Sequence, residues 1–325
     1  MFETDIIGVG LFDEFRVLKG DTTSNTARVI EFLTNMTEQL KQQLSSCYSV
    51  RAHYYYLFLK VQLYRKQGDY LQGKEVSQAL LNLVNTHPGL RSKKRLGTSY
   101  MRLAGIEMSN FKFKEAHDVS VYVMDIVHPK TRVFNSALLH RVFACIYLGN
   151  LQELQELLPY LDQIETQRPN DSQSNIAQYL KSCVAYINGD CDKASQLLNQ
   201  ISELYADKDG WNMGLRIYEI LMIIDKHQYD LATAKIETLR KHVARYDIDL
   251  RTKLIYKYLN LLEKDSYDFN KQSPARQEIL TEIIHEDPWS AISHEAVKFD
   301  VWLKAKIEKV AFYPLLVEEL KNMVL

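Results

Sequence analysis

The chain has 325 residues, with 12 Gly and 7 Pro, and 46% of its residues are hydrophobic while 25% are charged. Both helix-breaking residues fall below their average contents of about 7% and about 5%, which favours long helices over a strand-and-turn architecture. The formal net charge of −1 excludes a global field that would attract nucleic acid or an anionic membrane.

The N-terminal region is predicted to be irregular at first and helical afterwards. Residues 1–20 carry no periodic pattern, and they lack the basic n-region of a signal peptide. Residues 24–46 predict an amphipathic helix, because four apolar side chains fall on one of its faces: Val29, Leu33, Met36 and Leu40.

Cysteine usage and hydropathy predict a cytoplasmic protein. The four cysteines lie far apart and form no C-x-x-C pair: Cys47, Cys145, Cys183 and Cys191. We therefore expect reduced, mostly buried thiols, as in a cytosol-like compartment. No apolar run approaches the ~20 residues that a helix needs to span a bilayer.

Five short segments between residues 70 and 232 begin a helix in the same way and define a repeat of about forty residues. We take the last residue of each segment as an anchor. The anchors are spaced by 43, 38, 40 and 38 residues: Gly73, Ala116, Leu154, Ala194 and Ala232. Small residues dominate this position, as expected where two helices approach closely.

Positions at fixed distances from the anchors predict two helices in each repeat, called here helix A and helix B. Steps of four, seven and eleven residues after an anchor trace one face of helix B. These columns hold Ser77, Ser120, Leu158, Leu198 and Ile236; Leu80, Val123, Leu161, Ile201 and Leu239; and Val84, Val127, Glu165, Tyr205 and Val243. Ten residues before each anchor lies an apolar residue of helix A: Leu63, Ile106, Ala144, Val184 and Met222.

The predicted A and B spans alternate with turn-forming residues and prolines. The spans are 51–67 and 70–86, 93–109 and 112–127, 131–148 and 151–165, 172–188 and 191–205, and 211–227 and 229–246. Pro88, Pro129 and Pro169 follow B helices, where a proline cannot continue the helix. Pro159 falls inside the third B helix and is expected to kink it.

The pattern loosens after residue 247. A sixth A helix is predicted around Leu254 and Tyr258, and Ser273-Pro274 opens its partner as N-cap and first-turn proline. Asp287-Pro288 is predicted to open a terminal capping helix that carries Ile292, Ala296, Phe299 and Leu303. The fold class is therefore predicted to be all-α: about six antiparallel helix pairs in one solenoid over 21–325, with core repeats in 51–246 and a divergent repeat and cap in 247–325.

The segment from Leu103 to Ala116 resembles the tetratricopeptide-repeat family. It reproduces that family's run of leucine and a small residue, a hydrophobic pair, a turn, an aromatic residue, two polar residues and alanine. The repeat is longer than the family's 34 residues, and the family's early tryptophan is missing. The segment from Asp287 to Leu303 resembles the closing helix of uncharacterised bacterial tetratricopeptide proteins. The resemblance implies a right-handed solenoid whose concave groove, lined mainly by A helices, binds a protein or peptide.

Nothing in the sequence reaches the level of a catalytic motif, so no enzyme activity, cofactor or metal is predicted. Gly8-Val9-Gly10 begins like a dinucleotide fingerprint, but Asp13 holds the third glycine position. His285-Glu286 and His294-Glu295 do not form the H-E-x-x-H pattern of a zinc site. The basic run 91–95 is interpreted as a solvated loop rather than a phosphate contact.

Two sets of columns compete for the lining of the groove. Thirteen residues before the anchors lies a mostly charged column: Lys60, Leu103, Arg141, Lys181 and Glu219. Family geometry instead indicates positions 15 and 8 residues before the anchors, which hold Phe58, Met101, Leu139, Tyr179 and Ile217, and Arg65, Met108, Ile146, Tyr186 and Ile224. An apolar groove would hold an amphipathic helix or another copy of the chain, and a charged stripe would hold an acidic segment.

The predicted function is that of a non-catalytic binding scaffold. Its predicted partner-binding residues are drawn from both sets: Lys60, Arg65, Arg141, Lys181, Arg216, Tyr179 and Tyr186. If A helices line the groove, four basic residues are expected to project from equivalent faces of successive repeats and to clamp carboxylates of an acidic partner: Arg65, Arg141, Lys181 and Arg216. The alternative is a peptide-sensing regulatory domain that switches an effector outside this chain. The partner is expected to be a protein or peptide, with a second copy of the chain as one candidate, and neither nucleic acid nor a membrane.

Overall fold

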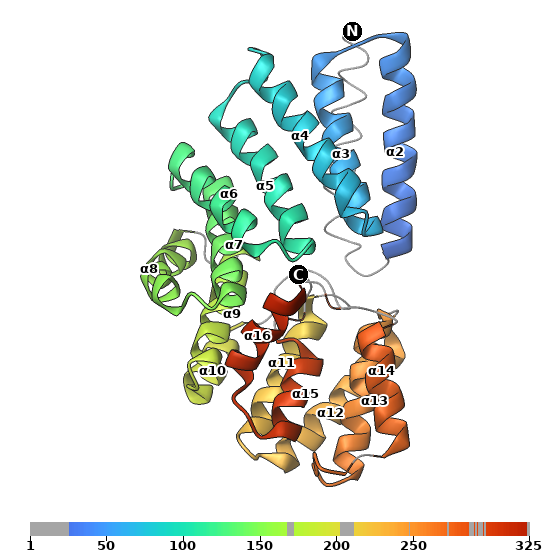
Figure 1. The fold of residues 1–325 in the computed structure, drawn as a ribbon, viewed down its shortest axis with the longest axis vertical. Helices are drawn as coiled ribbons and strands as arrows, with labels where there is room; N and C mark the ends of the chain where they lie inside the picture. Colours follow the sequence, from blue (N-terminus) through green and yellow to red (C-terminus); the bar gives the residue numbers. More distant parts are fainter. Residues whose placement is uncertain are drawn as a thin grey trace. The chain divides into compact units, whose positions relative to one another are not determined.

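A computed structural model describes residues 26–167, 172–201, 211–246, 248–271, 273–285, 289, 291, 295 and 297–323. These residues form fifteen helices, α2 to α16, and no strand (Figure 1). The all-α prediction is thereby confirmed. No helix among the described residues is long and apolar enough to cross a membrane.

Two compact units can be distinguished, Met1–Cys145 and Ile146–Leu325, and each is described by itself. The boundary falls within the helix Arg132–Leu148. The single solenoid domain predicted over 21–325 stays a prediction, and the irregular segment predicted for 1–20 lies outside the described residues.

The helices of the first unit follow the predicted spans to within about one or two residues. They are α2 (Thr26–Ser46), α3 (Val50–Gln67), α4 (Tyr70–Thr86), α5 (Lys93–Ser109), α6 (Phe113–Ile126) and α7 (Arg132–Leu148), which ends in the second unit. Each helix from α2 to α5 packs against the next one along the chain. This sequential packing is the arrangement expected of stacked helix pairs.

Local capping explains where these helices begin and end. Ser49 and Ser92 accept hydrogen bonds from backbone N–H groups in the first turns of α3 and α5, and Asp69 does the same for α4. Gly68 ends α3 with a φ of 77°, a left-handed conformation that a residue without a Cβ adopts at little cost.

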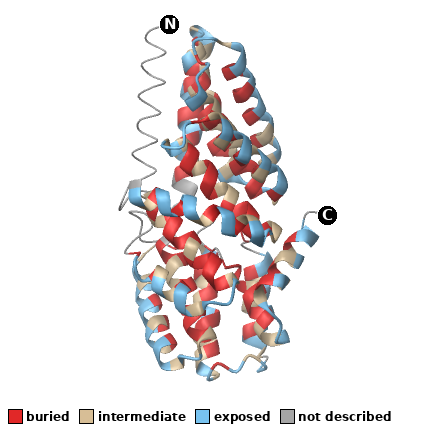
Figure 2. Ribbon diagram, turned by 90° about the vertical axis from the view of Figure 1, so that its left-hand side faces the viewer, coloured by how far each residue is buried: buried red, intermediate tan, exposed pale blue. Residues whose placement is uncertain are grey.

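The anchor positions of the first unit lie at buried contacts between helices. A Cβ added to Gly73 would lie 2.7 Å from Ile106 Cδ1, so no larger residue fits between α4 and α5 without a shift. Ala116 is 0% exposed. Figure 2 shows the buried positions, in red, as stripes along the helices, and the predicted A and B columns of this unit lie in them: Leu63, Ile106, Ser77, Ser120, Leu80, Val123, Val84 and Val127.

The second unit continues the helix pairs with less regular ends. It contains α8 (Leu151–Gln167), α9 (Ser172–Ile187), α10 (Cys191–Leu198), α11 (Trp211–Asp225), α12 (Tyr229–Arg245), α13 (Leu250–Lys264), α14 (Pro274–His285), α15 (Phe299–Glu308) and α16 (Phe312–Met323). The helix α8 runs through Pro159. The anchors Leu154, Ala194 and Ala232 are 0–1% exposed.

The prediction for the C-terminal end was wrong in two respects. The capping helix begins at Phe299 rather than at Asp287, because the described residues 289, 291, 295, 297 and 298 are not helical. The backbone N–H of Phe299 instead donates to Glu295 Oε1 over 2.6 Å. The helix α16 was also not predicted. Earlier in the chain, α10 ends at Leu198, before the predicted limit of 205.

Candidate binding surface

The charged column that precedes the anchors by thirteen residues is partly exposed in all five repeats. In the second unit its charges are neutralised within the chain. Lys181 Nζ lies 2.7 Å from Asp162 Oδ1 and 3.0 Å from Glu165 Oε1. The Glu219 carboxylate forms an ion pair with Lys235 Nζ over 2.7 Å. These side chains join A helices to B helices and are not unpaired charges.

In the first unit the same column carries a cation without an acidic partner. Lys60 Nζ lies 5.5 Å from the ring centres of both Tyr56 and Tyr64, in cation–π range. Among the described residues, no carboxylate pairs with this ammonium group. The α3 side of this unit therefore presents a positive charge flanked by two partly buried aromatic rings.

The two tyrosines proposed for the groove are part of the core of the second unit. Tyr179 and Tyr186 are 0% and 6% exposed, and both rings meet Tyr218 edge-on at 5.7 and 5.6 Å. The Tyr186 hydroxyl donates to Asp225 Oδ2 over 2.6 Å. Burial and the Asp225 carboxylate raise the pKa of Tyr186 well above its ordinary value.

The C-terminal helices α15 and α16 cover part of the A-helix surface of the second unit. Trp302 Nε1 donates to Asp225 Oδ1 over 3.1 Å, and Lys306 Nζ lies 2.6 Å from the same oxygen. The Phe312 ring lies 5.9 Å from that of Tyr186, and the Tyr313 hydroxyl donates to the Ile146 carbonyl over 2.9 Å. The residues eight positions before the anchors in this unit, such as Ile146 and Tyr186, are therefore contacted by the C-terminal helices of the same chain.

The basic residues expected to project from equivalent faces do not share one register. Arg65 precedes its anchor by 8 residues, Arg141 and Lys181 by 13, and Arg216 by 16. Positions five apart on an α-helix differ by about 140° in direction. Arg65, Arg141 and Arg216 are partly exposed, so each stays a candidate contact on its own helix.

The structure adds one residue that the column analysis missed. Arg102 on α5 precedes its anchor by 14 residues, next to the column that was followed. Its guanidinium carbon lies 4.7 Å from the centre of the Phe58 ring on α3. Its Nε is buried and has no hydrogen-bond partner. The only sign of Arg102 in the sequence was that a basic residue stands between the apolar residues Met101 and Leu103 of a predicted A helix.

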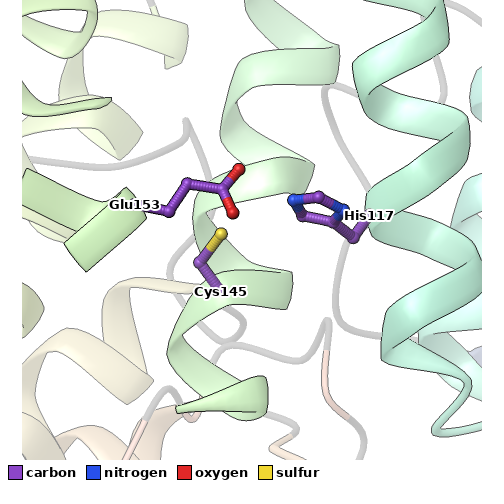
Figure 3. Close-up of side chains that lie close together, drawn as sticks. All are labelled: His117, Cys145 and Glu153. Carbon is purple, nitrogen blue, oxygen red and sulfur yellow. The ribbon is translucent and has the colours of Figure 1, made fainter. Parts of the chain in front are cut away.

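A pair of potential metal ligands also comes together in the first unit. Figure 3 shows His117 of α6 and Cys145 of α7 turned toward one another, with ligand atoms within 4.8 Å. The third labelled side chain, Glu153, belongs to the second unit. Two donors are fewer than the three or four protein ligands of zinc sites, so the described residues of the first unit alone do not form one here.

These features define an all-helical repeat protein built from antiparallel helix pairs, with a fold like that of tetratricopeptide-type solenoids. Among solved structures the fold is similar to that of a Rap protein complexed with competence and sporulation factor. The TM-score is 0.69 at 10% sequence identity, and the match covers 99% of this chain and 98% of that chain. No protein-family model matches the sequence, and no curated protein matches it either.

Proposed function

We propose that the chain is a non-catalytic scaffold that binds a protein or peptide segment along its A helices. The observation that carries this proposal is the unpaired positive charge of the first unit. Lys60 and Arg102, on successive A helices, have no carboxylate partner among the described residues. Lys181 and Glu219, which hold the position of Lys60 in the repeats of the second unit, are both ion-paired.

The fold supports the same proposal. A Rap protein of similar fold was solved in complex with a factor that it binds, and helix-pair solenoids offer extended binding surfaces. The near-zero net charge argues against nucleic acid as the partner. All four cysteines are free, which agrees with a reducing, cytoplasmic compartment.

The second candidate function is a peptide-sensing regulatory domain, and α15 and α16 favour it. A partner that competed with these helices for the A-helix surface of the second unit would release them. Hydrogen exchange of α15 and α16, measured with and without the captured partner, separates the two candidates. Faster exchange on binding indicates the regulator, and unchanged exchange indicates the simple scaffold.

The test of the proposed function is a triple charge reversal. Lys60→Glu, Arg141→Glu and Arg216→Glu change partly exposed A-helix cations. The matched control changes the exposed residues Lys130, Lys193 and Lys321 to Glu, with the same change in net charge. Each protein is immobilised, and partners captured from a lysate are quantified by mass spectrometry.

We expect the wild-type chain and the control to capture the same partners, and the A-helix variant to lose them while its melting temperature stays nearly unchanged. Capture of the same partners by the A-helix variant, with the same salt dependence, would contradict the proposal.

A further inference from the structure

A histidine–aspartate pair on α6 faces a buried thiol on α7 in the first unit. His117 Nδ1 lies 3.1 Å from Asp118 Oδ1, and the same oxygen accepts from Lys114 Nζ over 2.6 Å. Figure 3 shows the other ring nitrogen of His117 turned toward the Cys145 sulfur, and the ligand atoms of these two residues lie within 4.8 Å of each other. The proposed function makes no use of this row of carboxylate, imidazole and thiol.

The Asp118 carboxylate sets the form of the imidazole. An ionised carboxylate only accepts hydrogen bonds, so in the neutral ring Nδ1 carries the hydrogen and donates it to Asp118. The lone pair of Nε2 is then directed at the thiol. Histidines that bind metals almost always donate their other ring N–H to a carboxylate, a carbonyl or water, which fixes the ring and makes it a stronger ligand. His117 therefore has the outer hydrogen-bond partner of a metal-binding histidine.

Burial decides which reagent can reach the thiol. Cys145 is 0% exposed, whereas the His117 side chain is 14% exposed. The same three residue types could activate a thiol as a nucleophile, but a fully buried sulfur cannot reach the carbonyl group of a peptide or an ester. A single metal ion is small enough to enter beside the partly exposed imidazole. The arrangement therefore fits an ion better than a covalent reaction.

The donor set selects the kind of ion. One thiolate and one imidazole are too few for Zn²⁺, which takes three or four protein ligands. Soft sulfur donors select Cu(I), and a monovalent ion of this kind is satisfied by two donors on opposite sides. With bonds like those of zinc, about 2.3 Å to sulfur and about 2.0 Å to nitrogen, a straight sulfur–metal–nitrogen arrangement spans about 4.3 Å. This span fits within the 4.8 Å that bounds the separation of the two ligand atoms.

We propose that His117 Nε2 and Cys145 Sγ form a two-coordinate site for Cu(I), with Asp118 as the positioning residue of the imidazole. Binding displaces the thiol proton, so one proton is released and the oxidation state of copper does not change. Both ligands belong to the first unit, and the site uses no donor from the second unit. This site goes beyond the proposed function, because the bound ion ties α6 to α7 and stabilises the folded chain.

The test is a competition titration of the full chain, reduced and free of oxygen, against the chromogenic Cu(I) chelator bicinchoninate. Cys47 and Cys191 are only partly buried and are soft donors as well, so each protein carries Cys47→Ser and Cys191→Ser; this double variant is called the background chain. The wild-type chain is measured beside it.

Three further changes alter the site: His117→Ala, Cys145→Ser and Asp118→Asn. The matched control is His128→Ala, which removes an exposed histidine of the same unit. X-ray absorption spectroscopy of the copper-loaded background chain identifies the atoms bound to the ion, and it does not depend on whether a variant folds.

We expect the background chain to hold one Cu(I) against the chelator and the His128→Ala control to match it. Cys145→Ser and His117→Ala should abolish this binding, because each removes one of the two ligands. Asp118→Asn should weaken the affinity by about 10–100-fold, the usual effect of losing an outer partner of a metal-binding histidine. The absorption spectrum should show one sulfur and one imidazole nitrogen on the copper.

Cu(I) binding that survives both His117→Ala and Cys145→Ser would overturn the site, and so would a copper ion with two sulfur neighbours in the spectrum. Zn²⁺ held by the same two residues as tightly as Cu(I) would overturn the assignment of the ion. An unchanged affinity in Asp118→Asn would contradict its positioning role. Absence of bound copper in the background chain would overturn the whole inference, while the proposed function, tested by the A-helix charge reversal, would stand.

Discussion

Two fully buried alanines set the distance between neighbouring helices. Ala116 and Ala194 are both 0% exposed, so Ala→Leu at either position forces extra volume into a packed contact. We expect each variant to lose about 1–3 kcal/mol of unfolding free energy, measured from urea denaturation. The control is Ala234→Leu, at an exposed position of α12, which should stay within about 0.5 kcal/mol of the wild type. Unchanged midpoints for both buried variants would show that the anchors do not lie at tight contacts.

Cysteine chemistry gives a second test at the level of single residues. Cys183 is 4% exposed, and burial raises the pKa of its thiol to about 12. The thiolate is the reactive form, so Cys183 should stay protonated and unreactive at pH 8. Cys47 is partly exposed. Iodoacetamide labelling of the native chain, followed by peptide mapping, should modify Cys47 at least about tenfold faster than Cys183. Similar rates in native protein, rather than only in urea, would contradict the buried position of Cys183.

At the scale of elements, the Asp225 carboxylate joins α15 to the repeat. Asp225 accepts hydrogen bonds from Tyr186 and Trp302 and pairs with Lys306. Asp225→Ala leaves the Trp302 and Tyr186 donors without their acceptor, which should cost about 1–3 kcal/mol and speed hydrogen exchange in α15. Asp230→Ala, at an exposed position of α12, is the control. Unaltered exchange in α15 after the Asp225 change would mean that other contacts hold this helix.

The A and B helices could be placed from the sequence because their signals are local. Ser49, Asp69 and Ser92 cap helices beside them, and Gly68 stops α3 through its own backbone freedom. The start of α15 could not be placed in this way. It depends on Glu295, whose carboxylate accepts from Phe299 N–H and also pairs with Arg251, 44 residues earlier.

At the scale of the whole molecule, helix content is the clearest measurable quantity. We expect a far-ultraviolet circular dichroism spectrum with more than about 65% helix and no substantial strand, well above the roughly 30–35% helix of an average globular protein. The physical reason is that each helix pair buries its stripes against its neighbours rather than against a sheet. A pronounced strand component would contradict the fold.

The sequence alone determined the helix pairs, their repeat length and most of their limits, because periodicity and capping act over a few residues. It also pointed to basic A-helix residues, of which Lys60 has no acidic partner among the described residues. Only the tertiary structure decided which charges are neutralised, since Lys181 and Glu219 meet their partners 16 or more residues away. The burial of Tyr179 and Tyr186, the covering of the second unit by α15 and α16, and the unbonded Nε of Arg102 likewise depend on side chains brought together from different helices. Such contacts join residues that are far apart in the sequence, so they leave no periodic pattern in it. The free energy of a buried polar group also depends on all the groups around it, which only the folded chain brings together.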